Sequence, residues 1–220
     1  MKFFIPLTIA LAASTASAEI YAPTPYSPRH IVFFNFEIST EVDAEDNKYL
    51  YYNGYFHQDT DRLLQQAVDE YDPEYIVFNS RGGVISVIDS VRETIKNIPI
   101  IVDEKCMSAC AVAVAPSNDL TINGVLGFHR PTRASASSSF ISGIKPEPIE
   151  PAELVEMFDA GVSSTLDMTV WFLKAGLSLE FLETVMRDTD AKHFMTFNDA
   201  DNFQKCKTNE DCVMNIELFE

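Results

Sequence analysis

The chain has 220 residues, a formal net charge of −17 at pH 7 and four cysteines. A chain this acidic does not attract nucleic acid through bulk electrostatics, so we expect no nucleic-acid partner. Its length suits one domain with a sizeable core.

The first eighteen residues have the pattern of a secretory signal peptide. Lys2 gives a positive start, residues 3–13 are apolar, and Ala16-Ser17-Ala18 fits a small-x-small cleavage site. We therefore predict a signal peptide over 1–18 and a periplasmic or secreted protein. The apolar run is short for a membrane span, although an uncleaved anchor stays open as an alternative.

Beyond the signal peptide, strand and helix patterns alternate. Residues 19–48 are predicted as a lead-in with a first strand, and residues 49–220 as one domain with a mobile loop over 130–150. In chain order, the patterns predict strands over 30–38 and 49–52, a helix over 59–71, a strand over 75–79, a helix over 85–96, a strand over 98–102, a helix over 106–115, strands over 120–122 and 125–129, helices over 151–175 and 178–187, a strand over 194–196 and a short helix after 198. This order predicts an α/β fold with a mostly parallel sheet.

Ser108 lies where a predicted strand gives way to a predicted helix of small residues. A serine at such a corner can present its hydroxyl at a helix N-terminus, where free N–H groups and the helix dipole favour negative charge. Acyl transfer needs those conditions, because an oxyanion develops beside the nucleophile. For a serine taken alone, a helix cap is the simpler role.

Four cysteines in an exported chain allow disulfides, with three alternative pairings. Proximity in the sequence favours Cys106 with Cys110, a pair that brackets Ser108, and Cys206 with Cys212. The histidines show no paired spacing with these cysteines, so we predict no zinc site. We predict no other metal and no cofactor.

Three segments are predicted to meet at one edge of the sheet. Gly82-Gly83, Ser108 and His129 each follow a strand, and the carboxyl ends of neighbouring strands converge on a crevice in an open α/β sheet. Paired glycines let a backbone N–H approach a ligand, and with the Ala109 N–H they would supply two donors to an oxyanion. His129 would be the general base that takes the Ser108 proton.

The same segments resemble the proteolytic subunit of the Clp protease, a serine peptidase of the ClpP/crotonase superfamily. Residues 79–85, Asn-Ser-Arg-Gly-Gly-Val-Ile, resemble its glycine motif, which usually reads Ser-Pro-Gly-Gly, so that Arg81 replaces a proline. Residues 106–110 match its nucleophile position, and residues 127–131, Gly-Phe-His-Arg-Pro, resemble its histidine motif. The match covers roughly residues 49–203.

The resemblance implies a spiral of ββα repeats with a mostly parallel sheet and C-terminal helices. It implies that Ser108 is the nucleophile and that Gly83 and Ala109 donate to the oxyanion, while Gly82 shapes the turn. The family's acidic residue is the exception, because an ungapped alignment puts Lys192 at that position. Asp190 is our first choice for the acid and Asp188 another; a Ser–His dyad or a base at Lys192 stays open.

These observations predict an exported serine peptidase or related acyl hydrolase, acting on a peptide or protein substrate. The alternative is a catalytically degenerate binding or scaffold protein that has kept the fold. A crotonase-like lyase acting on thioesters is a third reading, although export argues against coenzyme A substrates. The ATPase partner of the Clp subunits is not expected outside the inner membrane, and homo-oligomerisation stays open.

Overall fold

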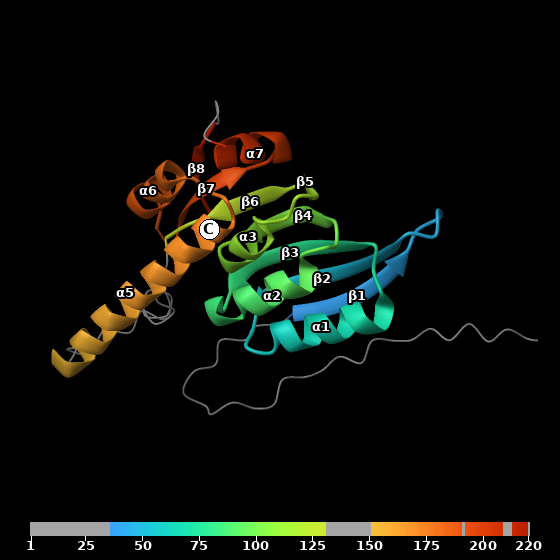
Figure 1. Cartoon of the computed structure of the whole chain (residues 1–220), viewed down its shortest axis with the longest axis horizontal. Helices are drawn as coiled ribbons and strands as arrows, with labels where there is room; N and C mark the ends of the chain where they lie inside the picture. The colour runs from blue at the N-terminus through green and yellow to red at the C-terminus, as the bar shows by residue number, and fades with distance from the viewer. Residues whose placement is uncertain (1–35, 131–150, 191, 209–212, 220) are drawn as a thin grey trace, which may run out of the picture. The chain divides into compact units, whose positions relative to one another are not determined.

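The structure is a computed structural model that describes residues 36–130, 151–190, 192–208 and 213–219 (Figure 1). The predicted signal peptide, residues 131–150 of the predicted loop, and Cys212 lie outside the described residues.

Strands and helices alternate through the first part of the chain, as the sequence predicts. In order, the elements are β1 (Phe36–Val42), β2 (Lys48–Phe56), α1 (Thr60–Tyr71), β3 (Tyr75–Gly83), the short 3₁₀ helix η1 (Ile85–Val87), α2 (Ile88–Ile95), β4 (Ile100–Met107), α3 (Ala109–Val114), β5 (Leu120–Ile122), β6 (Val125–Phe128), α5 (Pro151–Lys174), α6 (Leu179–Asp188), β7 (His193–Phe197), α7 (Ala200–Thr208) and β8 (Asn215–Leu218).

The strands form one mixed sheet in the order β1-β2-β3-β4-β6-β7-β8, with β5 paired to β4 beside β6. The strands β2, β3, β4 and β6 are parallel to one another, while β1 at one edge and β7 and β8 at the other are antiparallel to their neighbours. The fold is therefore α/β, but the prediction of a mostly parallel sheet is wrong. Antiparallel strands need only short connections, and β1 and β2 are joined by one around Asp46.

Two strands run further than their hydrophobic patterns indicate. β3 continues through Gly82 and Gly83, because its partner β2 extends to Phe56 and pairs with both glycines. β4 continues to Met107, because its polar second half pairs with β6. The helix predicted over 106–115 therefore begins only at Ala109, and Ser108 is the residue between strand and helix.

The helices α1, α2 and α3 pack side by side in that order, with α1 against β2 and α3 against β3 (Figure 1). The side chain of Arg92 in α2 is about 10% exposed, and its Nη2 donates to the carbonyl oxygens of Val112 in α3 and Trp171 in α5, at 2.8 and 3.1 Å. The Arg92 guanidinium therefore links α2, α3 and α5 by hydrogen bonds, and α3 is the helix that begins after Ser108. Among the described helices, none combines the length and apolar character that crossing a bilayer requires.

A cluster of buried phenylalanines fixes the end of β6. The ring of Phe128, which is fully buried, lies between 5.2 and 6.1 Å from those of Phe172, Phe181, Phe197 and Phe203. These neighbours come from α5, α6, β7 and α7. Because Phe128 packs against several elements at once, its backbone position is well defined. The backbone of the next residue, His129, is therefore anchored to the core.

Candidate active site

Three adjacent parallel strands end at the candidate site. β3 ends in Gly82-Gly83, β4 leads into Ser108, and β6 leads into His129. Since these strands are parallel neighbours, their carboxyl ends lie at the same edge of the sheet. The convergence expected from the sequence is therefore present.

Ser108 has a backbone conformation that is rare for a residue with a side chain, with φ 55° and ψ −124°. Such strain persists only where the surroundings hold it, and it is characteristic of nucleophiles on a sharp strand-to-helix turn. The Ser108 side chain forms no cap to α3, whereas Ser178 caps α6 by accepting a hydrogen bond from the Phe181 amide. Ser108 therefore does not play the ordinary role of a helix-capping serine.

The hydroxyl of Ser108 points at His129 instead. The distance between Ser108 Oγ and His129 Nε2 is 2.7 Å, which is a short hydrogen bond between side chains 21 positions apart in the chain. This is the contact that a serine nucleophile and its general base require.

The imidazole of His129 lies largely out of water. Burial lowers the pKa of His129 from 6.5 to about 4, partly opposed by the Arg130 backbone and by the charge of Asp190. The ring is therefore neutral at pH 7 and can accept the serine proton. Its other nitrogen, Nδ1, is buried and forms no hydrogen bond of good geometry with the described residues, although the Arg130 backbone lies close enough to raise the pKa of the ring.

Gly82 lies directly against the serine corner. A Cβ added to Gly82 would lie 2.5 Å from the Met107 carbonyl oxygen, 2.7 Å from Ser108 Cβ and 2.9 Å from the Ala109 amide nitrogen. The Ala109 amide belongs to the first residue of α3, so it has no acceptor within the helix. Gly83 lies one step further along and packs against the backbone of Phe56 in β2.

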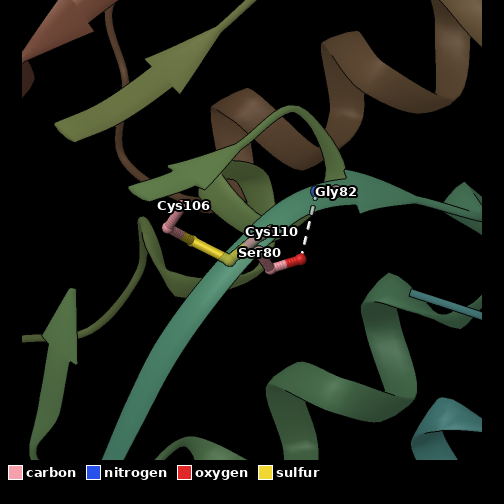
Figure 2. The surroundings of a disulfide bond; sticks show 4 residues. All are labelled: Ser80, Gly82, Cys106 and Cys110. Atoms are coloured by element: carbon pink, nitrogen blue, oxygen red, sulfur yellow. Dashed lines mark hydrogen bonds between the residues drawn. A yellow bond between two sulfur atoms is a disulfide. The ribbon is translucent and has the colours of Figure 1, made fainter. Parts of the chain in front are cut away.

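The Gly82 amide has a partner in this structure. It donates to the hydroxyl of Ser80, at 3.1 Å, and Ser80 is 1% exposed (Figure 2). An oxyanion is a stronger acceptor than a neutral hydroxyl. The Gly82 amide is therefore bonded to Ser80 in this structure, by a weaker bond than the one that a negatively charged oxygen would form with it.

A disulfide bridges the serine corner from β4 to α3. Cys106 and Cys110 are bonded, with Cα atoms 5.2 Å apart, and both residues are fully buried (Figure 2). The predicted pair is confirmed, and it constrains the two sides of Ser108. Cys206 in α7 is also disulfide-bonded, and its predicted partner, Cys212, lies outside the described residues.

The acid position is where the site departs from a triad. The carboxylate of Asp190 accepts from the amides of Lys192 and His193 and contacts His193 Nδ1, between 2.7 and 2.9 Å, and these bonds hold the pKa of Asp190 far below its usual range. Asp188 is paired with Arg187, and the Lys192 side chain is exposed. Within the described part of the chain, none of these three candidates forms a hydrogen bond with His129.

Two residues that the sequence did not single out contact the histidine segment. The hydroxyl of Thr189, which is 2% exposed, accepts from the Arg130 amide at 2.9 Å. The ring of Phe194 lies 4.5 Å from the His129 ring. Thr189 gives no sequence signal, because a threonine between two aspartates resembles any polar helix end.

No group of three or more histidine, cysteine or acidic residues that could hold a metal ion occurs in the ranges that the structure describes. Comparison with known proteins finds no family model that matches the chain and no curated protein with significant similarity to it.

Proposed function

We propose that this chain is an exported serine hydrolase, most simply a peptidase, in which Ser108 is the nucleophile and His129 the general base. The observation that carries the proposal is the 2.7 Å contact between Ser108 Oγ and His129 Nε2, made by a serine in a strained strand-to-helix turn. Neither feature is needed for a serine that only caps a helix.

In the proposed reaction, Ser108 Oγ attacks the carbonyl carbon of the substrate as its proton passes to His129 Nε2. The Ala109 amide and the turn at Gly82-Gly83 stabilise the negative oxygen, since amides at a helix N-terminus act on charge that develops beside them. His129 then returns the proton to the leaving amine or alcohol, which leaves an acyl-serine for water to hydrolyse.

Counting only the described residues, the arrangement is a dyad rather than a triad. A third carboxylate orients the histidine and stabilises its charged form, and its absence slows the reaction without abolishing it. Asp190 supplies a weaker substitute, because its charge raises the pKa of His129 without a hydrogen bond between them. The imidazolium formed during attack is therefore stabilised at longer range.

The resemblance to the Clp proteolytic subunit agrees with this assignment at the glycine, serine and histidine motifs, and we propose the same superfamily and its ββα spiral. Peptides or proteins are the substrate class that follows. The signal-peptide pattern supports export to the periplasm or beyond, where no ATPase partner is expected.

A non-catalytic binding or scaffold protein is the second candidate. The observation that favours it is the buried His129 Nδ1, which has no acceptor in the ranges that the structure describes, together with an exposed Lys192 where the resembling family has its acid. Such a protein would retain the fold and the serine corner but not the turnover.

Labelling by a fluorophosphonate probe distinguishes the two candidates. The oxidised, folded protein should form one covalent adduct, located at Ser108 by peptide mass spectrometry, and the variants Ser108→Ala and His129→Gln should form none at the same exposure. Ser117→Ala, which removes a serine hydroxyl that forms an exposed hydrogen bond to the Asp119 carbonyl oxygen, is the control and should label as the wild type does. A folded wild-type protein that stays unlabelled would contradict the hydrolase proposal and favour the scaffold candidate.

A further inference from the structure

The histidine of the proposed dyad is oriented although its ring lacks the usual partner. Its Nε2 is aimed at Ser108, yet Nδ1 has no hydrogen-bond partner among the described residues. A histidine with a free Nδ1 could rotate about its side-chain torsions unless the backbone and the packing hold it. Within the part of the chain that the structure describes, something other than a carboxylate therefore fixes this ring.

The backbone around His129 is anchored on both sides. Before it, the Gly127 carbonyl oxygen accepts a hydrogen bond from the Ser108 amide, at 2.8 Å. After it, the Arg130 amide donates to Thr189 Oγ1, at 2.9 Å. The first bond ties the histidine strand to the nucleophile, and the second ties it to the end of α6.

Thr189 is itself held firmly. Its hydroxyl donates to the carbonyl oxygen of Val185, at 2.6 Å, while it accepts from Arg130, so the oxygen is used as donor and acceptor together. The residue is 2% exposed, which excludes water as a competing partner. Through the Thr189 hydroxyl, the end of α6 is therefore hydrogen-bonded to Arg130, the residue next to the proposed base.

We propose that Thr189 is the positioning residue of this site and that it fixes His129 through the Arg130 amide, in place of an acid bonded to the ring. The inference rests on the proposed function and deepens it. Phe194 completes the arrangement, because its ring packs 4.5 Å from the imidazole and limits its rotation. A small displacement of a general base costs about 10- to 100-fold in rate, so the anchor matters for chemistry as well as for folding.

The test compares three variants of the oxidised protein by the second-order rate constant of fluorophosphonate labelling at Ser108. Thr189→Val keeps the shape and removes the hydroxyl, and labelling should slow about 10- to 100-fold. Thr189→Ser retains the hydroxyl and should restore the wild-type rate. Thr184→Val is the matched control, because the Thr184 hydroxyl also donates to a carbonyl four residues earlier in α6, that of Glu180, but is exposed and has no bond to Arg130.

A spectroscopic measurement separates positioning from loss of stability. The ¹⁵N signals of the His129 ring should shift in Thr189→Val and stay unchanged in Thr184→Val. If Thr189→Val does not fold, Thr189→Ala removes the same hydroxyl without burying a second methyl group against Arg130, and it is measured at reduced temperature.

The outcomes distinguish the two proposals. A folded wild-type protein that no probe labels contradicts the proposed function itself. A wild type that labels, with a folded Thr189→Val that labels equally fast and keeps its ¹⁵N signals, overturns the role of Thr189 and leaves the dyad intact.

Discussion

The amide of Ser108 donates to the carbonyl oxygen of Gly127, so the proposed nucleophile is bonded through its own backbone to the strand that leads into His129. The side-chain contact between Ser108 and His129 lies beside this backbone bond. The two residues are therefore held together twice, by main chain and by side chain. A change on either strand should disturb both contacts.

The glycine turn offers a direct test of how tightly the corner is built. Gly82→Ala should greatly reduce labelling of Ser108, because the new Cβ would collide with the Met107 carbonyl and the Ala109 amide and because φ is +87° at this position. We expect destabilisation well above the ~1–2 kcal/mol that a left-handed conformation costs an L-residue. Urea unfolding and probe labelling of the same preparations measure the two effects.

Gly176→Ala is the matched control for that substitution. Gly176 also has a positive φ, +76°, but an added Cβ would meet nothing within 4 Å. It should cost only the backbone strain, on the order of 1–2 kcal/mol, and leave the labelling rate unchanged. Equal effects of the two substitutions on labelling would show that crowding at Gly82 does not shape the site.

The neutral, buried His129 predicts the pH dependence of labelling. Because burial lowers its pKa to about 4, the proposed base stays unprotonated well below neutrality, and the labelling rate should fall only as the pH approaches 4. An ordinary exposed histidine would give a midpoint near 6.5. Labelling followed across this range with a neutral fluorophosphonate, on protein shown to stay folded, would reveal which midpoint applies.

The lowered pKa of His129 also predicts how the free energy of unfolding depends on pH. Between pH 6.5 and about 4, the unfolded chain takes up a proton at His129 while the folded chain does not, so folding becomes less favourable as the pH falls. The part contributed by His129 amounts to about 3 kcal/mol once the pH is below 4. Comparing the wild type with His129→Gln isolates this part, since all other groups are common to both, and parallel pH profiles would contradict the burial of a neutral ring.

The Cys106–Cys110 disulfide should support the strained conformation of Ser108. Replacing both cysteines by alanine should lower the unfolding free energy by about 2 kcal/mol, the value for closing so short a loop, and should slow labelling as the corner relaxes. Replacing Cys206 and Cys212 by alanine is the control, because Cys206 lies in α7 and not at the corner. A double variant at 106 and 110 that labels at the wild-type rate would mean that packing alone holds Ser108.

Sequence reasoning succeeded where a local pattern determines a local outcome. The small, apolar residues after Ser108 predicted a buried helix, and the short spacing of Cys106 and Cys110 predicted their bond. It failed where pairing with another strand decides the outcome. The polar second half of β4 becomes strand only by pairing with β6, and β8 has only four residues, so the alternation of Ile216 and Leu218 with polar residues was not recognised as a strand.

The contacts of His129 show a second limit of prediction from the sequence. The sequence suggests only acidic residues as hydrogen-bond partners of the His129 ring, because acidic residues near the expected position can be recognised without a structure. The structure instead brings the hydroxyl of Thr189 to the next amide along the chain, at 2.9 Å. Such a contact depends on where α6 ends relative to β6, which long-range packing determines.

Asp190 provides the remaining test, because it is the acid that the sequence favours. Asp190→Asn removes the charge but keeps an oxygen for the amides of Lys192 and His193, so the turn should survive. Since the carboxylate has no bond to His129, labelling should slow far less than the roughly 10²- to 10⁴-fold expected for loss of the general base in His129→Gln. Asp188→Asn, which removes a charge paired with Arg187, is the control and should leave the rate unchanged. If Asp190→Asn is instead as slow as His129→Gln, then Asp190 bonds the ring during the reaction, and the site is a triad that assembles only when substrate is bound.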